Sequence, residues 1–154
     1  MADTATDHAS LVGINHVALE VGDIDAALKF YRSLFEFELR GRTESMVFLD
    51  MGDQFIAMAE SADAGERPDD HRHFGLVVDD PDLVEERLAS VEADRLDTSG
   101  LDFRDPWGNR IQIVGYEEIQ FSKREAVLES MELADLEKSA SARAELAEKG
   151  IDIE

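Results

Sequence analysis

The sequence contains no cysteine, which excludes disulfide bonds, thiolate catalysis and metal sites built on cysteine. Long apolar runs are also missing: the longest cover only a few residues, whereas a transmembrane helix needs about 20. The segment Met1–His8 has neither a basic region nor an apolar core, so it does not resemble a signal peptide. The last two absences make a cytoplasmic protein the default expectation.

Positive charge is scarce. The chain has 15 basic residues, only four of them lysine, against 36 acidic residues, and its net charge is −21. Binding to nucleic acid or to an anionic membrane needs a basic surface and is therefore not expected. The acidic residues are spread along the whole chain, a pattern typical of the solvated surface of halophilic proteins. The alternative, an acidic patch for a basic partner, fits this even spread less well.

One passage of the chain occurs twice. The segment His16–Asp23 reads HVALEVGD, and His73–Asp80, 57 residues later, reads HFGLVVDD. Such an internal repeat predicts two similar modules, over residues 12–60 and 71–116, with a cleft between them and a linker at 61–70. With 154 residues and 44% hydrophobic content, we expect both modules to share one domain with a substantial core.

Each module is expected to fold as a strand, a helix and three further strands. Alternating apolar residues predict the strands, and apolar residues at i, i+3 and i+4 predict the helices. Asp23 and Asp80 suit the caps of the two helices, and Pro81 suits a first helical position. The expected ranges are strands 13–21, 37–43, 45–51 and 54–60 with a helix at 24–35, then strands 72–79, 94–98, 100–104 and 110–116 with a helix that starts at 81.

Residues 122–150 predict a C-terminal helical extension. Ser122–Glu125 has the pattern of a capping box, and Lys149 followed by Gly150 is a suitable stop. The apolar stripe changes phase within the segment, which predicts two helical pieces or one bent helix. We expect the extension to lie on the surface of the domain, with a role in oligomerisation as the alternative.

Several of these segments together resemble the vicinal oxygen chelate superfamily, the group of glyoxalase I, bleomycin-resistance proteins and extradiol dioxygenases. They are Ile14–Val21, the pairs Phe30-Tyr31 and Leu34-Phe35, His73–Val78, and Phe103–Ile113 with its motif Asp-Pro-x-Gly-Asn before an apolar strand. The resemblance covers residues 11–121. It implies an α+β fold of two paired βαβββ modules whose curved sheets wrap a cleft, with a divalent metal held at four strand positions.

The resemblance places these four positions on His16, Ala57, His73 and Gln112. Strand alternation agrees for Gln112, because its isoleucine neighbours should face the helices and leave it facing the cleft. The family usually has glutamate at the two last-strand positions, where this chain has alanine and glutamine. We therefore expect His16, His73 and Gln112 to hold a divalent ion (Fe, Mn, Zn or Ni) weakly, because no ligand is charged. Alternatively, the histidines are hydrogen-bonded structural residues and Gln112 contacts substrate.

Two residues of the second module are expected to contact substrate. Arg104 can orient an anionic group bidentately, and Trp107 lies at the tip of the last hairpin, at the edge of the cleft. Pairing with nearby carboxylates and packing within the turn are the alternatives. No catalytic residue is assigned, since the amide of Gln112 cannot accept and release a proton near neutral pH.

Three functional classes remain open. We expect a metal-dependent lyase, isomerase or dioxygenase that acts on a small oxygenated metabolite. The alternative is a metal-free protein that sequesters a small molecule, as bleomycin-resistance proteins do, and the third class is a module with a role in assembly. The expected partners are a small-molecule ligand and a second copy of the chain in a homodimer.

Overall fold

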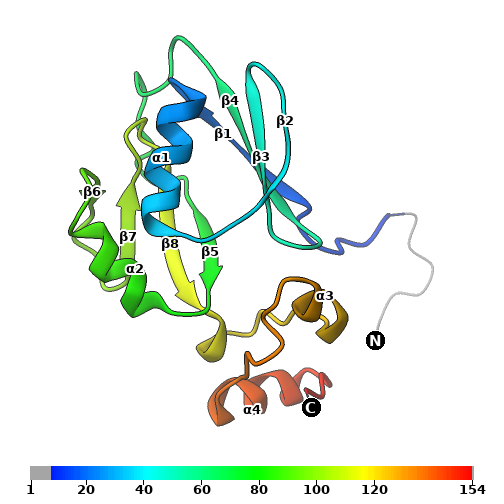
Figure 1. Ribbon diagram of the computed structural model, residues 1–154. Coiled ribbons are helices and arrows are strands. Elements are labelled where there is room, and N and C mark those ends of the chain that lie inside the picture. Colours follow the sequence, from blue (N-terminus) through cyan, green and yellow to red (C-terminus); the bar gives the residue numbers. More distant parts are fainter. Residues whose placement is uncertain (1–7, 154) are drawn as a thin grey trace.

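The computed structural model describes residues 8–153, in which two four-stranded sheets are each accompanied by a helix (Figure 1). The first module comprises β1 (His16–Val21), α1 (Ile24–Leu34), β2 (Leu39–Arg42), β3 (Met46–Asp50) and β4 (Phe55–Glu60). The second comprises β5 (Phe74–Val78), α2 (Pro81–Leu88), β6 (Asp94–Arg95), β7 (Leu101–Arg104) and β8 (Arg110–Gly115). This order confirms the expected α+β fold of two βαβββ modules. Of the segment Met1–His8, which does not resemble a signal peptide, only His8 lies within the described residues.

The two sheets have the same strand order and register. The order is β1-β4-β3-β2 in the first sheet and β5-β8-β7-β6 in the second, and in each the first and last strands of the module run parallel. Val17 lies opposite Ile56 in one sheet, and Phe74 lies opposite Ile111 in the other. In both pairs the first residue follows a repeated histidine, so the sequence repeat corresponds to equivalent positions in the two sheets.

Both module helices begin where the sequence predicts. Asp23 accepts a hydrogen bond from the amide of Ala26 at 2.7 Å, and Asp80 accepts one from the amide of Leu83 at 3.2 Å. Pro81 occupies the first turn of α2, where its missing N–H leaves no hydrogen bond unmade.

Strand β6 is much shorter than expected. The sequence predicts a strand over 94–98, whereas the structure has only Asp94–Arg95. The expectation is wrong because the chain turns there: the amide of Thr98 donates to the carbonyl of Leu96 at 3.1 Å. The Thr98 hydroxyl then bonds to the Asp102 carboxylate at 3.2 Å.

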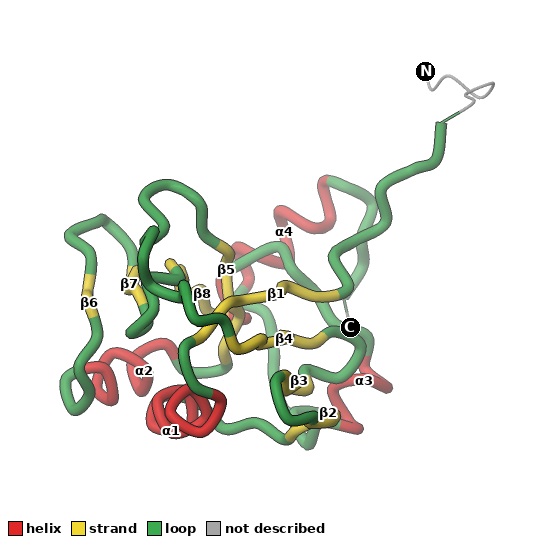
Figure 2. The backbone as a smooth tube through the Cα atoms, turned by 90° about the horizontal axis from the view of Figure 1, so that it is seen from above, coloured by secondary structure: helices red, strands yellow, loops and turns green. Residues whose placement is uncertain are grey.

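One hydrophobic core joins the two modules. Helices α1 and α2 contact each other, and in Figure 2 both lie below β1, β7 and β8. Between them lie fully buried side chains from both modules, among them Tyr31, Met58, Phe103 and Ile111. Because each sheet uses one face for this core, the opposite face is left for the repeated histidines.

The C-terminal extension forms two helical pieces, as predicted. After the 3₁₀ turn η1 (Tyr116–Glu118) come α3 (Glu125–Ser130) and α4 (Ala140–Glu148). The predicted capping box is wrong, because α3 begins only at Glu125 and no side chain caps it. The predicted stop is confirmed, since Gly150 follows α4 with φ +82°. Within residues 8–153, no helix combines the length and apolarity needed to cross a bilayer.

Candidate functional site

His16 lies at the start of β1, and two contacts fix its ring: a stacking contact on one face and a hydrogen bond at Nδ1. The imidazole stacks on the ring of Phe55, with centroids 4.7 Å apart and planes 9° from parallel. Its Nδ1 makes a 2.8 Å hydrogen bond with Oδ1 of Asn15. An amide oxygen only accepts, so Nδ1 is the donor of this bond, and the neutral form of His16 has its lone pair on Nε2. Among residues 8–153 no hydrogen bond uses Nε2 of His16.

His73 repeats the Nδ1 contact of His16 in the second module. It precedes β5, and its Nδ1 makes a 2.8 Å hydrogen bond with the backbone carbonyl of His71. A carbonyl also only accepts, so the lone pair again lies on Nε2. A histidine that donates its second ring N–H to an oxygen is in the state in which histidines ligate metals. In their neutral form the two repeated histidines therefore have the same tautomer, the one that can bind a metal through Nε2.

Gln112 lies on the same face of the second sheet as His73. In the pairing of β5 with β8, Gly75 lies opposite Gln112. His73 precedes Gly75 by two residues, so its side chain is expected on the same face. With strands ~4.8 Å apart and a rise of ~3.3 Å per residue, the two backbones are about 8 Å apart, within reach of both side chains. The Gln112 amide nitrogen lies near Gly100 in the loop before β7, 3.5 Å from where a Cβ would stand on that glycine.

Ala57, the equivalent of Gln112 in the first module, supplies no ligand. It is 4% exposed and lies opposite Ala18. Its methyl group offers no donor atom, so the first module contributes only His16 to the four positions that the resemblance indicates.

Asp102 is a carboxylate that sequence analysis missed. It lies directly opposite Gln112 and is only 4% exposed. Arg110 forms an ion pair with it at 3.1 Å, and the Thr98 hydroxyl donates to it at 3.2 Å. Strand alternation could have found it, because Phe103 beside it belongs to the core and leaves Asp102 on the face of Gln112.

The chain brings only part of the predicted ligand set together. His73 and Gln112 share one sheet face, whereas His16 belongs to the other sheet. In the described residues, no three His, Cys, Asp or Glu side chains are grouped so as to hold a metal ion. The donors themselves fit a divalent transition metal, because two neutral imidazoles with free Nε2 atoms and one amide oxygen are common ligands for such ions.

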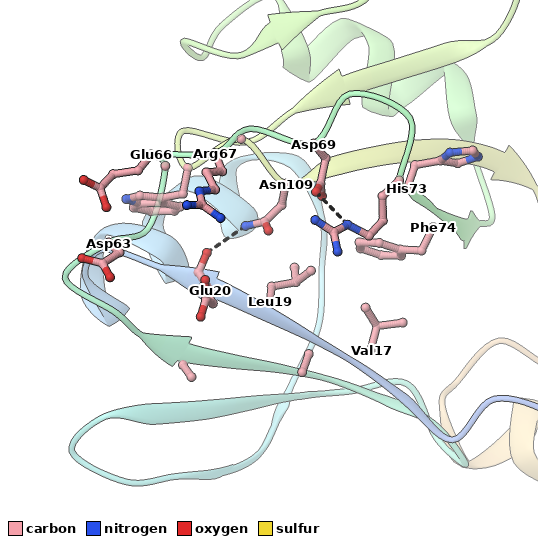
Figure 3. Close-up of a pocket in the computed structure, with 16 residues that line it drawn as sticks. Val17, Leu19, Glu20, Asp63, Glu66, Arg67, Asp69, His73, Phe74 and Asn109 are labelled. Carbon is pink, nitrogen blue, oxygen red and sulfur yellow. Dashed lines mark hydrogen bonds and ion pairs between the residues drawn. The ribbon is translucent and has the colours of Figure 1, made fainter.

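A groove of about 1050 Å³ lies between the modules (Figure 3). We call it the inter-module groove; it is lined by β1 residues 17–20, Ala59, Asp63, residues 65–67, Asp69, residues 72–74 and residues 107–109. In Figure 3, Asp63 and Glu66 lie at one end and His73 and Phe74 at the other. His16 and Gln112 are not part of its lining.

The two predicted substrate-binding residues differ in their surroundings. Trp107 lines the groove and is fixed by close packing, since a Cβ added to Gly22 would lie 2.6 Å from the indole nitrogen. Arg104 is not part of the lining. Its Nε donates to the carbonyl of Asp69 at 2.7 Å and its Nη1 to Asp94 at 2.7 Å, so it ties the linker to β6 and β7.

A buried polar cluster joins the modules beside the groove. The Tyr31 hydroxyl donates to Asp105, and Asn109 donates both to Asp105 and to the carbonyl of Glu20. Burial raises the pKa of Asp105 above its ordinary value, although the hydrogen bonds from Asn109 and Tyr31 oppose that shift. Burial, followed by the charge of Asp105, raises the pKa of Tyr31 well above its ordinary value.

Two repeated βαβββ modules, each opening on a histidine, define the class of vicinal oxygen chelate proteins. The chain belongs to the Glyoxalase/Bleomycin resistance protein/Dioxygenase superfamily, which matches residues 13–113. The metallothiol transferase FosB of Bacillus licheniformis is 22% identical over 119 residues, covering 70% of this chain and 77% of that protein.

Solved structures of fosfomycin resistance proteins share the fold. FosX from Listeria monocytogenes, crystallised with Mn(II) and a sulfate ion, has a TM-score of 0.56 at 18% identity and covers 79% of this chain and 99% of its own. FosX from Mesorhizobium loti has a TM-score of 0.56 at 17% identity, covering 68% of this chain and 92% of its own. The resemblance inferred from the sequence is confirmed.

Proposed function

We propose that this protein is a metal-dependent enzyme of its superfamily, a lyase, isomerase or dioxygenase that acts on a small oxygenated metabolite. We assign the divalent ion to Nε2 of His73 and Oε1 of Gln112, which share one sheet face, joined by Nε2 of His16 when two copies of the chain pair. The observation that carries the proposal is the matched state of the two histidines: each uses Nδ1 on an oxygen acceptor and keeps Nε2 free.

Mn(II) is the first ion to test, because it is present in the FosX structure from Listeria monocytogenes. Fe, Zn and Ni ions remain candidates for the same donors. When bound, such an ion polarises an oxygen of the substrate as a Lewis acid. Trp107 forms an apolar wall of the substrate site. Arg104 is the proposed anchor for an anionic group, which would have to compete with Asp94 for the guanidinium.

A homodimer is part of the proposal. Leu11, Val12 and Ile14 are exposed large apolar residues on an arm, residues 9–15, that contains no charged side chain and in Figure 2 leaves the body of the protein. A second copy can cover this arm without burying charged side chains against each other, because residues 9–15 carry none. In such a dimer, His16 of one copy can lie close to the sheet face of the second copy that carries His73 and Gln112. We also place the protein in the cytoplasm.

The metal site is tested by calorimetric titration of the apo protein with Mn²⁺. We expect weak binding to wild type, loss of binding in His73→Ala, and tighter binding in Gln112→Glu, because a carboxylate offsets the charge of the ion. His71→Ala is the matched control: it removes an imidazole but keeps the backbone carbonyl that His73 needs. It should bind Mn²⁺ as wild type does.

The second candidate function is metal-free binding of a small molecule in the inter-module groove. The observation in its favour is that neither last-strand position carries a carboxylate, since these are Ala57 and Gln112. If neither wild type nor Gln112→Glu binds Mn²⁺, Fe²⁺, Zn²⁺ or Ni²⁺, this second function replaces the first.

The homodimer is tested by light scattering coupled to size-exclusion chromatography. Replacing Leu11 and Val12 together by aspartate should shift the protein from dimer to monomer. Leu83→Asp on α2 is the control, because it also charges an exposed leucine but lies away from the arm. Equal masses for all three proteins would remove the arm from the dimer interface.

A further inference from the structure

The C-terminal extension lies outside the part of the chain that matches the family, residues 13–113, yet it contacts the first module closely. Helix α3 packs on the turn between β3 and β4. A Cβ added to Gly52, which has φ +82°, would lie 2.7 Å from both Sδ of Met131 and Cγ1 of Val127. The bare glycine therefore lets α3 approach the turn to within van der Waals contact.

Lys123 connects the extension to the same turn. Its side chain is only 6% exposed, and its ammonium group lies 2.5 Å from Oδ1 of Asp53 and 3.2 Å from Oε1 of Gln54. The hydrogen bond from Lys123 also lowers the pKa of Asp53. The contact with Oε1 fixes the oxygen end of the Gln54 amide.

The other end of the Gln54 amide reaches the strand that carries His16. Its Nε2 donates to the carbonyl of Ile14 at 3.0 Å, two residues before His16. The backbone amide of Phe55, which follows Gln54, donates to the carbonyl of Asn15 at 3.2 Å. Gln54 is thus a bridge between Lys123 and the start of β1.

A second series of contacts connects the turn between β3 and β4 to the ring of His16. Arg40 donates to the carbonyls of Gly52 and Gln54, at 2.9 and 3.2 Å, and its guanidinium carbon lies 4.5 Å from the centroid of the Phe55 ring. Phe55 in turn stacks on His16. Any displacement of the turn therefore moves both the backbone before His16 and the ring on which it rests.

The far part of the extension is anchored to the second module. Lys138 is 5% exposed and donates to three backbone carbonyls, those of Tyr116, Ile119 and Phe121. Its ammonium nitrogen lies 3.6 Å from the centroid of the Tyr116 ring. The extension is consequently held at the end of β8 by Lys138 and at the first module by Lys123.

We propose that Lys123 is a positioning residue for His16. Through Gln54, the C-terminal extension fixes the position and the ring orientation of His16. A segment at the C-terminal end of the chain thereby affects the metal affinity of a histidine near its N-terminal end. The contacts stand independently of any ion; only the effect on metal affinity rests on the proposed function.

The first test uses the apo protein. The chain has four histidines, so their ring protons can be resolved and assigned by nuclear magnetic resonance. In Lys123→Met, the His16 resonance should move toward the position of a free histidine, because the ring loses its fixed stacking on Phe55. It should stay in place in Lys149→Met, the charge-matched control on the exposed end of α4, and return in Lys123→Arg.

Gln54→Leu distinguishes the positioning of His16 from the docking of the extension on the first module. It removes both hydrogen bonds of the Gln54 amide and leaves the Lys123–Asp53 ion pair intact. It should shift the His16 resonance as Lys123→Met does, with α3 still docked. An unchanged His16 resonance in folded Lys123→Met or in Gln54→Leu would overturn the proposal.

The second test is the affinity for Mn²⁺. Lys123→Met should weaken binding about tenfold, the low end of the effects known for residues that orient metal ligands, while Lys149→Met should not. If the wild-type protein binds no ion, the proposed function is contradicted. The resonance test still decides whether Lys123 positions His16. Wild type and Lys123→Met with equal affinities contradict the positioning role.

Discussion

The hydroxyl of Tyr31 donates a 2.7 Å hydrogen bond to the carboxylate of Asp105, 74 residues further along the chain. Both residues are buried. One lies on α1 of the first module and the other in the turn between β7 and β8 of the second. Asp105 also accepts from the backbone amides of Trp107 and Asn109, at 2.9 and 3.0 Å, so a single carboxylate organises the turn and the contact between modules.

Tyr31→Phe should lower the free energy of unfolding by about 1.5–3 kcal/mol, the range for a hydrogen bond to a charged group. The ring remains to fill the core, so the loss reports on the hydrogen bond alone. The measurement is urea denaturation at neutral pH. Ser33→Ala on the same helix is the control: its hydroxyl bonds only to the carbonyl of Lys29, and we expect a change of less than about 0.5 kcal/mol.

Alkaline pH should destabilise the protein through Tyr31. Its folded-state pKa is raised well above the unfolded value of about 10. The stability that this protonated hydroxyl contributes is therefore complete below pH ~10 and is lost as the pH rises above that value, because only the unfolded chain ionises there. Urea midpoints measured from pH 8 to 11 should fall more steeply for wild type than for Tyr31→Phe. Parallel curves would contradict the assignment.

Asp102→Asn should destabilise the protein by about 3 kcal/mol, because it leaves the Arg110 guanidinium without its only negatively charged partner among the described residues, in a mostly buried site. Asp94→Asn is the matched control. It removes a carboxylate paired with Arg104, but that carboxylate is 63% exposed, so the expected loss is below about 1 kcal/mol. Equal losses in the two variants would show that burial does not distinguish these ion pairs.

Salt should stabilise this protein. A net charge of −21 creates self-repulsion in the folded state, and added KCl screens it. The midpoint of thermal unfolding should rise from tens of millimolar to molar KCl, and most of the rise should occur at the lower concentrations, where the screening length changes fastest. A midpoint that stays flat or falls across this range contradicts the halophilic interpretation.

The repeat and strand alternation were sufficient to predict the two modules, their helix caps and the equivalence of His16 and His73. Those features depend on residues close together in the sequence, so local patterns report them. The Nδ1 contacts of the two histidines, by contrast, depend on the orientation of single side chains and had no sequence signal.

Contacts between distant segments could not be predicted. Lys123 meets Asp53, and Tyr31 meets Asp105, only because of how the modules and the extension pack together, which no periodicity encodes. The capping-box prediction failed for the same reason: tertiary contacts hold Lys123 outside α3, and they override the local preference of Ser122–Glu125. Whether His16, His73 and Gln112 share one ion remains a prediction.

Strand pairing never crosses the linker. In residues 8–153, β1 pairs only with β4 and β5 only with β8, so each ladder is complete within its own module. During synthesis on the ribosome, the first sheet can therefore close as soon as residue 60 has emerged, whereas Asp105 is not yet made. We therefore expect strand pairing within each module to precede the docking of the two modules, which is made through side chains.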